Sequence, residues 1–511
     1  MSAVYIDGAS LSARKVAAVA GGAPVRLASS AREAMRANHD AWRRHGTADI
    51  LGDKETWLIG ASTAASPRER VRGFVLSHCA GVGPPLAEPE VRALMLCRAN
   101  VLAAACSGVR PELVELLLAM LNKGVHPVVP AKGSVGAAGD LAPLAHVAQV
   151  ALRMGGRATV RGEALDGVVA MQGLPEVKAA SKETLSLING ASLTVACGAL
   201  AVHRAERLLR SAERALAQTM AVVLADADCL DARAMASRRH PGACAVAERM
   251  RALIEGSALV HRGRSADAFS IRCAPAVLGA AWDALDYVRG VVEHELNGAC
   301  DNPLLFDGEV IEAGNFHGAP VALALDHLKV ALTQVASIAE RRVFRMTYGR
   351  LTGNLPSFLL ESSGVDSGFM LAQYTAASLV SECKGLAHPA SVDSIPTGQH
   401  HEDHVPMGPA AARGLLAIVE NLAEVLAIEL LVGAQGLDFR LEGTSFSPKG
   451  EKITGQPVAP ASAIQEIQET VRAVSPRWTA DRVLHRDLEA VARRVRAGDF
   501  EGPRTEPAAP W

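Results

Sequence analysis

Long stretches rich in alanine and leucine, with charged residues along one side, dominate this chain. Hydrophobic residues make up 49% of the sequence but aromatic residues only 4%, so the core must come from Ala, Leu and Val. Ala and Leu favour helices, and long one-sided helices pack into bundles. The pattern therefore predicts a mainly α protein. The long helices are expected at residues 192–225, 282–295, 319–347, 368–386 and 410–433.

The chain is also longer than one compact core. Its 511 residues exceed the roughly 250–300 residues at which a single core stops growing. Pro111 and Gly124 bracket a short helix, and residues 158–167 fit a small hairpin. We expect a smaller N-terminal α+β part in residues 1–190 and the long-helix bundle in residues 191–500. A disordered tail is expected at residues 501–511.

Charge and composition exclude several classes of protein. The net charge is −2 and no block of like charge occurs, so we expect no nucleic-acid partner. The nine cysteines form no CxxC pair, which favours reduced thiols over disulfides or zinc. Glutamates interrupt the most apolar run, residues 415–432, so it is interpreted as a core helix. With no signal-peptide pattern at the N-terminus, we expect a cytoplasmic protein without a membrane partner.

A glycine-rich loop and a set of motifs carry the chemical information. Residues 133–144 read Gly-Ser-Val-Gly-Ala-Ala-Gly-Asp-Leu-Ala-Pro-Leu, and glycines let backbones approach closely. Further motifs follow in order along the chain. They include Val75-Leu76-Ser77-His78, Leu187-Ile188-Asn189-Gly190, Ser270-Ile271-Arg272-Cys273, Asp301-Asn302-Pro303-Leu304, Gly314-Asn315-Phe316-His317, Glu402-Asp403-His404-Val405 and Gly436-Leu437-Asp438-Phe439-Arg440.

This ordered set resembles the aromatic amino acid lyases, the family of histidine and phenylalanine ammonia-lyases. The resemblance implies a long helical bundle of the ammonia-lyase (fumarase/aspartase-like) type. It also implies a homotetramer in which residues from three chains meet at each active site. In that family an Ala-Ser-Gly tripeptide cyclises and dehydrates into methylideneimidazolone (MIO), an electrophilic prosthetic group. Here the tripeptide is Ala137-Ala138-Gly139. Because Ala138 has no hydroxyl to lose, we expect no MIO and no other cofactor.

The chain departs from the family pattern at further positions. Leu51 stands where the lid segment of the family has a catalytic tyrosine, and Ala266 replaces a glutamine. Phe269 replaces a second tyrosine, and His400-His401 replaces Asn-Gln. A single engineered serine-to-alanine change does not explain these losses, which together indicate natural divergence.

The resemblance implies a set of substrate-binding residues. Arg272 is the first of these, because a guanidinium matches a carboxylate with two parallel hydrogen bonds; a structural ion pair is the alternative. Asn189 and Asn302 would bind an anionic ligand or tie loops together. His400 and Phe316 complete the set, with packing as the alternative for Phe316. The predicted ligand is a small carboxylate-bearing molecule.

The predicted catalytic groups are one acid and two histidines. Glu402 is the general-base candidate, and His78 and His401 are acid/base candidates. A satisfied core histidine is the alternative for His78. Asp140 closes the MIO-type loop, which we define as residues 137–140, and an N-cap role on the following helix is expected for it.

Two further features have alternative interpretations. His400, His401 and His404 could hold a metal, but Pro396 and Gly398 indicate a loop. We therefore predict no metal and expect one of the new histidines to replace the lost glutamine. Residues 53–55 of the altered lid segment are interpreted as solvated surface, or as groups that enter the site if the lid closes.

Three functions fit these residues. The first is MIO-independent acid/base chemistry on a small carboxylate-bearing substrate. The second is a non-catalytic pseudoenzyme, or a binding partner of an active relative. The third is a conventional ammonia-lyase that converts L-histidine or an aromatic amino acid to an arylacrylate and ammonia, present here as an inactive Ser-to-Ala form. We rank them in this order.

Overall fold

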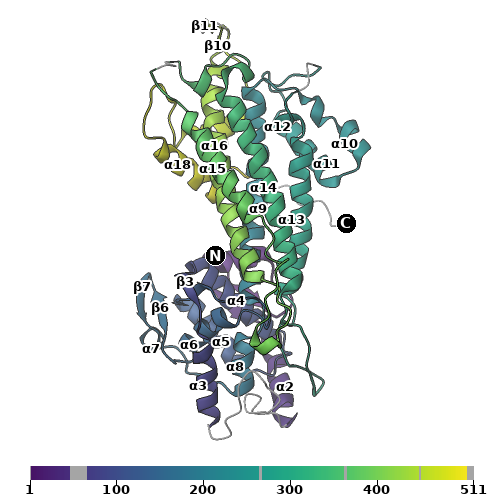
Figure 1. The fold of residues 1–511 in the computed structure, drawn as a ribbon, viewed down its shortest axis with the longest axis vertical. Coiled ribbons are helices and arrows are strands. Elements are labelled where there is room, and N and C mark those ends of the chain that lie inside the picture. Colours follow the sequence, from purple (N-terminus) through teal and green to yellow (C-terminus); the bar gives the residue numbers. More distant parts are fainter. Residues whose placement is uncertain (1, 46–65, 264–266, 362–364, 448–450, 503–511) are drawn as a thin grey trace. The chain divides into compact units, whose positions relative to one another are not determined.

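The computed structural model describes residues 2–45, 66–263, 267–361, 365–447 and 451–502. It is mainly helical (Figure 1), which confirms the predicted fold class. The α-helices are α1 Ala13–Ala20, α2 Ser29–His45, α3 Pro67–His78, α4 Glu88–Ala103, α5 Pro111–Lys123, α6 Leu141–Ala151, α7 Gly167–Ala170, α8 Ser181–Ile188, α9 Ser192–Val222, α10 Ala232–Arg238, α11 Pro241–Leu253, α12 Phe269–Arg272, α13 Ala274–Leu296, α14 Ala319–Thr347, α15 Met370–Leu386, α16 Gly408–Leu441, α17 Ser462–Arg472 and α18 Leu484–Ala497.

The strands are short and form small separate sheets. β1 and β2 are parallel, β4-β6-β7 form an antiparallel sheet, and β3-β5, β8-β9 and β10-β11 are antiparallel pairs. The predicted hairpin is β6-β7. The strands are β1 Val4–Ile6, β2 Val25–Leu27, β3 Val82–Pro85, β4 Val125–Pro127, β5 Pro130–Lys132, β6 Arg157–Val160, β7 Glu163–Asp166, β8 Leu304–Phe306, β9 Glu309–Ile311, β10 Thr444–Phe446 and β11 Lys452–Thr454.

All five predicted long helices form, with some boundaries moved. α14 has the predicted bounds, whereas α13 begins eight residues earlier and α16 continues to Leu441. α5 begins at Pro111 and ends before Gly124, whose φ of +70° is the left-handed conformation that glycine adopts at no cost. Proline and glycine therefore predicted the ends of α5 correctly. The sequence did not predict the ends of α13 and α16, where tertiary packing extends an apolar helix.

The chain divides into two compact units. Unit 1 comprises Met1–His203, Tyr287–Asp326 and Pro389–Leu415, and unit 2 comprises Arg204–Asp286, His327–His388 and Leu416–Trp511. The predicted boundary between the N-terminal part and the long-helix bundle lies between residues 190 and 191, at the start of α9. In the structure the division falls inside α9, because the first turn of this helix is hydrogen-bonded to unit 1 through Asp140.

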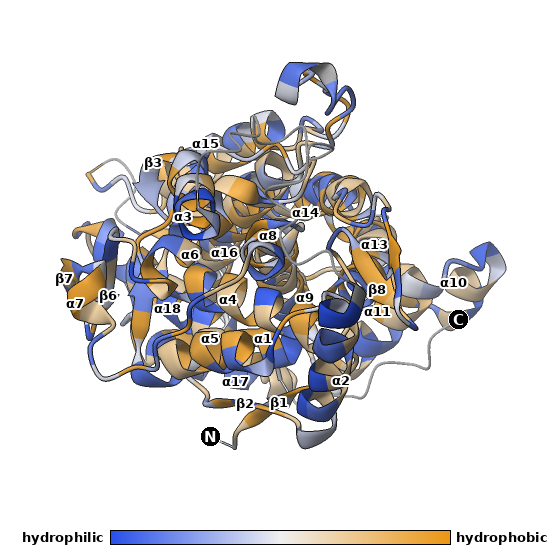
Figure 2. Ribbon diagram, turned by 90° about the horizontal axis from the view of Figure 1, so that it is seen from below, coloured by the Kyte–Doolittle hydropathy of each residue, from blue (hydrophilic) through white to orange (hydrophobic). Residues whose placement is uncertain are grey.

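Unit 1 is built around α4, which packs against α1 and α5. Every residue of α4 from Val91 to Ala103 is buried. The outer helix α2 is mostly hydrophilic, as Figure 2 shows, and it buries Ala31, Met35 and Trp42. These apolar residues recur at helical spacing, so one face of α2 is apolar.

Unit 2 contains buried charge that the sequence did not assign. Glu429 on α16, one of the glutamates that interrupt the apolar run, is fully buried. It accepts two hydrogen bonds from the fully buried Arg342 on α14, at 2.5 and 2.8 Å, and one from Thr219 on α9 at 2.9 Å. A buried charge is tolerated when it is paired and hydrogen-bonded. This contact joins the three helices, which also lie side by side in Figure 1.

Within the described residues, α14 is long and apolar enough to cross a membrane by length and composition alone. However, 61% of its most apolar window is buried inside the protein. Core helices of soluble proteins pass the same test, so this one helix is weak evidence for a membrane span.

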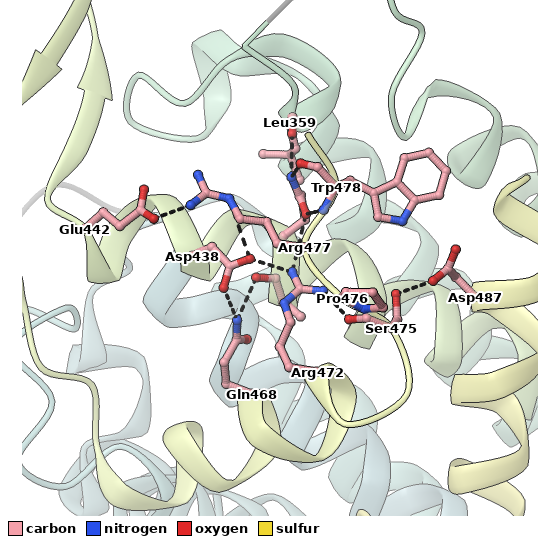
Figure 3. Close-up of polar contacts among 12 residues, drawn as sticks. Leu359, Asp438, Glu442, Gln468, Arg472, Ser475, Pro476, Arg477, Trp478 and Asp487 are labelled. Carbon is pink, nitrogen blue, oxygen red and sulfur yellow. Dashed lines mark hydrogen bonds and ion pairs between the residues drawn. The ribbon is translucent and has the colours of Figure 1, made fainter. Parts of the chain in front are cut away.

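A polar network joins α16, α17 and the segment that follows (Figure 3). Asp438 accepts hydrogen bonds from Gln468 at 2.6 Å and from Arg472 at 2.8 Å. Two residues along α16, the buried Arg440 donates to the carbonyls of Val222, Thr352 and Gly353. The motif at residues 436–440 thus has a structural role in unit 2.

Replacing Arg440 with methionine should destabilise the protein by about 2–4 kcal/mol, because it leaves buried carbonyls without their donor. The midpoint of urea unfolding measures this loss. Lysine at this position should not restore stability, since it lacks the planar fork. Arg493→Met, at an exposed position of α18, is the control and should change stability by less than about 0.5 kcal/mol. Equal midpoints for the two methionine variants would contradict the assigned role.

Candidate functional site

The MIO-type loop is held by direct contact between two backbone segments. Gly139 has a φ of +82°, and a Cβ there would lie 2.1 Å from the backbone nitrogen of Gly190. The N–H of Asp140 donates to the carbonyl of Gly190 at 2.9 Å. Any side chain at Gly139 would separate the segments, so glycine is required here.

Gly190 in turn lies against a buried arginine. A Cβ on Gly190 would lie 2.4 Å from Nη1 of Arg98 and 2.3 Å from the carbonyl oxygen of Cys300. Nη1 donates to the carbonyls of Asn189 and Cys300. Sequence reasoning did not select Arg98. Its signal was a charged residue inside residues 91–103, which are apolar apart from Arg92, Arg98 and Asn100.

Asp140 corrects one expectation. It precedes α6, but its side chain makes no capping bond to that helix. Instead, Oδ2 accepts from the N–H groups of Leu193 and Thr194 at 2.8 and 2.9 Å, so it caps α9. Oδ1 accepts from the hydroxyl of Ser134 at 2.9 Å. Burial raises the pKa of Asp140, and these hydrogen bonds oppose the rise.

The residues of the loop do not fit MIO. The side chain of Ala138 is a buried methyl group. It stands where the family has the serine whose hydroxyl is lost when MIO forms. The nearby hydroxyl of Ser134 lies outside the tripeptide, and it donates to Asp140 and accepts from the N–H of Gly136 at 3.1 Å. Ser134 therefore stabilises the loop and is no substitute for the missing serine.

Glu402 is held by a neighbour that sequence reasoning missed. The hydroxyl of Thr397 donates to Oε2 of Glu402, and the N–H of Thr397 donates to the Glu402 carbonyl at 3.0 Å. Glu402 is half-buried. Thr397 thus holds both the carboxylate and the backbone carbonyl of Glu402 within one loop. Nothing in the sequence marks a threonine five residues away as the partner of Glu402.

His78 lies within electrostatic reach of Glu402 in unit 1. Its Nδ1 donates to the carbonyl of Phe74 at 2.7 Å, which leaves Nε2 as the proton acceptor. Burial lowers the pKa of His78, while the Phe74 bond and the charge of Glu402 raise it. The next residue, Cys79, has its pKa raised to about 11 by burial, so its thiol stays protonated. His78 and Glu402 thus lie close enough in unit 1 for the charge of the carboxylate to raise the pKa of the ring.

The other histidines are arranged differently. His401 is exposed, and the side chain of His400 lies outside the described residues. His404 is exposed, and its carbonyl accepts from Nε2 of His317 at 3.1 Å. Among the described residues, no group of three or more His, Cys, Asp and Glu has the arrangement of a metal site.

The two asparagines differ in their contacts. Oδ1 of Asn302 accepts from the N–H of Ala313 at 2.7 Å, so Asn302 ties a loop. Asn189 is buried, and its Oδ1 has no hydrogen-bond partner within the described residues. Phe316 is half-buried. Asn189 is therefore the one of the two whose side-chain oxygen lacks a hydrogen bond within the described residues.

Arg272 ends α12 in unit 2, and its side chain is exposed. In the part of the chain that the structure describes, it forms no ion pair. Phe269 begins the same helix and is 73% exposed. Five of the positions singled out lie outside the described residues, namely Leu51, residues 53–55 and Ala266.

The chain is similar to known proteins over almost its whole length. The model of the family described as "Aromatic amino acid lyase" matches residues 11–459. A histidine ammonia-lyase of Gloeobacter violaceus is 44% identical over 97% of this chain and 96% of that protein. Among solved structures, histidine ammonia-lyase from Trypanosoma cruzi has a TM-score of 0.86 and 35% identity, covering 98% of this chain and 94% of the other. Tyrosine aminomutase from Streptomyces globisporus has a TM-score of 0.88 and 33% identity, with 97% of each chain covered.

Replacing Glu402 with glutamine should lower the pKa of His78 further, because it removes the negative charge that favours the protonated ring. NMR titration of the His78 Cε1–H signal, assigned with a His78→Gln variant, measures the shift. Asp403→Asn removes a neighbouring exposed charge and serves as the control. An unchanged His78 titration in Glu402→Gln would show that the two groups do not interact.

Proposed function

Because this chain belongs to the aromatic amino acid lyase family, we propose that it is a histidine ammonia-lyase-like protein that works without MIO. Its substrate is a small molecule with a carboxylate. One observation carries the proposal. Ala138 has no hydroxyl, yet it lies in a loop that is held by close contacts at Gly139 and by hydrogen bonds to Asp140.

The proposed chemistry is proton transfer by Glu402 and a histidine. Glu402 accepts a proton from a carbon of the substrate, and the electron pair left there forms a double bond as a neighbouring group departs. The departing group takes its proton from His401, or from His78 in its protonated form, in which Nε2 also carries a proton. Atoms and charge balance without a redox cofactor. The contact of Glu402 with Thr397 and its electrostatic interaction with His78 support these roles.

Arg272 is proposed to bind the substrate carboxylate. Its guanidinium is exposed and makes no ion pair among the described residues, and it offers two parallel hydrogen bonds. Asn189, Asn302, His400 and Phe316 are proposed as further contacts of the ligand. For Asn302 such a contact would use its amide N–H₂, since its oxygen is already bonded.

A second candidate is the ammonia-lyase reaction on L-histidine itself. One observation favours it over a protein without catalysis: relatives at about 44% identity over nearly the whole chain are named histidine ammonia-lyase. Under this candidate the present sequence is an inactive Ser-to-Ala form, and the active protein has serine in place of Ala138.

We propose that the protein is a cytoplasmic homotetramer. In unit 2, large apolar side chains are exposed on two neighbouring helices and directly after one of them, namely Val330 and Phe344 on α14, Tyr348 just past its end, and Leu371 and Tyr374 on α15. Exposed apolar groups of this kind are typical of subunit interfaces. Light scattering should give a mass of four 53.4 kDa chains, and a monomer mass would contradict the assembly.

The function is tested by incubating the protein with L-histidine, L-phenylalanine and L-tyrosine and following arylacrylate absorbance. We expect none from the natural sequence, and an intact mass equal to that of the sequence. A mass lower by two water molecules, or arylacrylate formation, would contradict a protein without MIO. Ala138→Ser is the matched variant, since it returns only the missing hydroxyl. Arylacrylate from this variant but not from the natural sequence would show that Ala138 alone blocks the ammonia-lyase reaction.

Arg272→Ala should weaken calorimetric binding of the tightest of these amino acids by about 10–100-fold, because a hydrogen bond to a charged group contributes about 1.5–3 kcal/mol. Arg233→Ala is the control. That arginine is exposed and pairs with Asp231 at the start of α10, so its loss should leave binding unchanged. Equal affinities in both variants would remove Arg272 from the site.

A further inference from the structure

A small cavity with a mainly apolar wall and a few polar groups lies behind the segment that supports the MIO-type loop, within unit 1. It has about 10 Å³ of room for the centre of a water-sized sphere. By the same measure one water molecule needs roughly 10–15 Å³. The residues that line it come from α4, α9, α13 and the turn after α13. They are Cys97, Val101, Ala191, Ser192, Val195, Glu295, Leu296 and Cys300.

The cavity contains a buried hydroxyl with an unmet hydrogen bond. Ser192 is 3% exposed, and its Oγ has no hydrogen-bond partner within the described residues. The other polar groups on the wall are the carboxyl of Glu295 and the thiol of Cys300, whose Sγ accepts from the N–H of Ala191 at 3.2 Å. A buried polar atom without a protein partner is bonded to ordered water in most proteins.

Neighbouring residues show the same shortage of partners. Four further buried atoms lack hydrogen-bond partners among the described residues. They are Oδ1 of Asn189, Oδ1 of Asp301, and Nε and Nη2 of Arg98. Each of these residues lies within two positions in sequence of a residue that lines the cavity. These unsatisfied polar groups belong to segments that also contribute to the wall of the cavity.

The charges around the cavity select a neutral occupant. Lys182 pairs with Asp301 at 3.0 Å, and the guanidinium of Arg98 also interacts with that single carboxylate. Two buried cations beside one carboxylate oppose the binding of a further cation. Glu295 and the thiol of Cys300 on the wall oppose an anion, and burial raises the pKa of Glu295, so its neutral form can donate a hydrogen bond.

We propose that this cavity binds one ordered water molecule, which accepts or donates hydrogen bonds at Ser192 Oγ and the carboxyl of Glu295. The water supports Ala191, whose neighbour Gly190 contacts the loop at Gly139. It is a structural site that does not depend on the substrate or on the proposed function.

A crystal structure of the full chain, at a resolution that shows ordered water, tests the site. The expected result is a density peak at about 2.7–3.2 Å from Ser192 Oγ and within the same range of Glu295. An empty cavity, or a direct bond from the Ser192 hydroxyl to the carbonyl of Ile188, would overturn the proposal.

Unfolding temperature gives a second test with opposite signs for the two cases. If the water is present, Ser192→Val displaces it, leaves the carboxyl of Glu295 with the Cys300 thiol as its remaining partner, and lowers the unfolding temperature more than Ser192→Ala does. If the cavity is dry, Ser192→Val fills empty space, removes an unsatisfied hydroxyl and raises the unfolding temperature. Ser211→Val on the same helix is the control, because the hydroxyl of Ser211 is already bonded to the Arg207 carbonyl at 3.1 Å. A rise in Ser192→Val alone would refute a bound water.

Discussion

The loop depends on a contact between two glycines. Gly139 lies on Gly190, and Gly190 lies on Arg98 and the Cys300 carbonyl, with no space for a side chain in either layer. Close backbone contact of this kind needs hydrogen-bond partners for every peptide group. Arg98 donates to two of the carbonyls, and Gly190 accepts from the N–H of Asp140. The position of Ala138 therefore follows from backbone geometry and a buried arginine.

Buried charge and exposed charge have different roles in this protein. Asp140, Arg98, Lys182 and Glu429 are buried, and each is hydrogen-bonded to groups that hold helices or loops together. Transfer of a charge from water is costly unless it is paired, so these groups are committed to structure. Arg272 is exposed, and within the described residues it has no ionic partner. Arg272 can therefore bind a ligand without breaking an ion pair that the described structure contains.

Sequence patterns predicted elements better than partners. The long helices, the hairpin and α5 were predicted because apolar spacing, Pro and Gly act over a few residues. Asp140 was expected to cap its own helix, and it caps α9 instead, about fifty residues away. Arg98 was missed for the same reason, because its carbonyl partners lie far away in the chain. Thr397 is only five residues from Glu402, but a hydrogen bond within a loop leaves no periodic signal. Glu402 and His78 were selected through the family motifs, and neither composition nor spacing would have identified them.

The sequence by itself determined the helical class, the family and the absence of a hydroxyl at Ala138, because these depend on residue identity and local order. The tertiary structure decided what the loop rests on, which helix Asp140 caps, and that His78 and Glu402 interact. These depend on contacts between segments far apart in the chain, which form only when the apolar faces are buried together. The loop was thus recognisable from twelve residues, whereas its support comes from α4, α9 and the turn after α13.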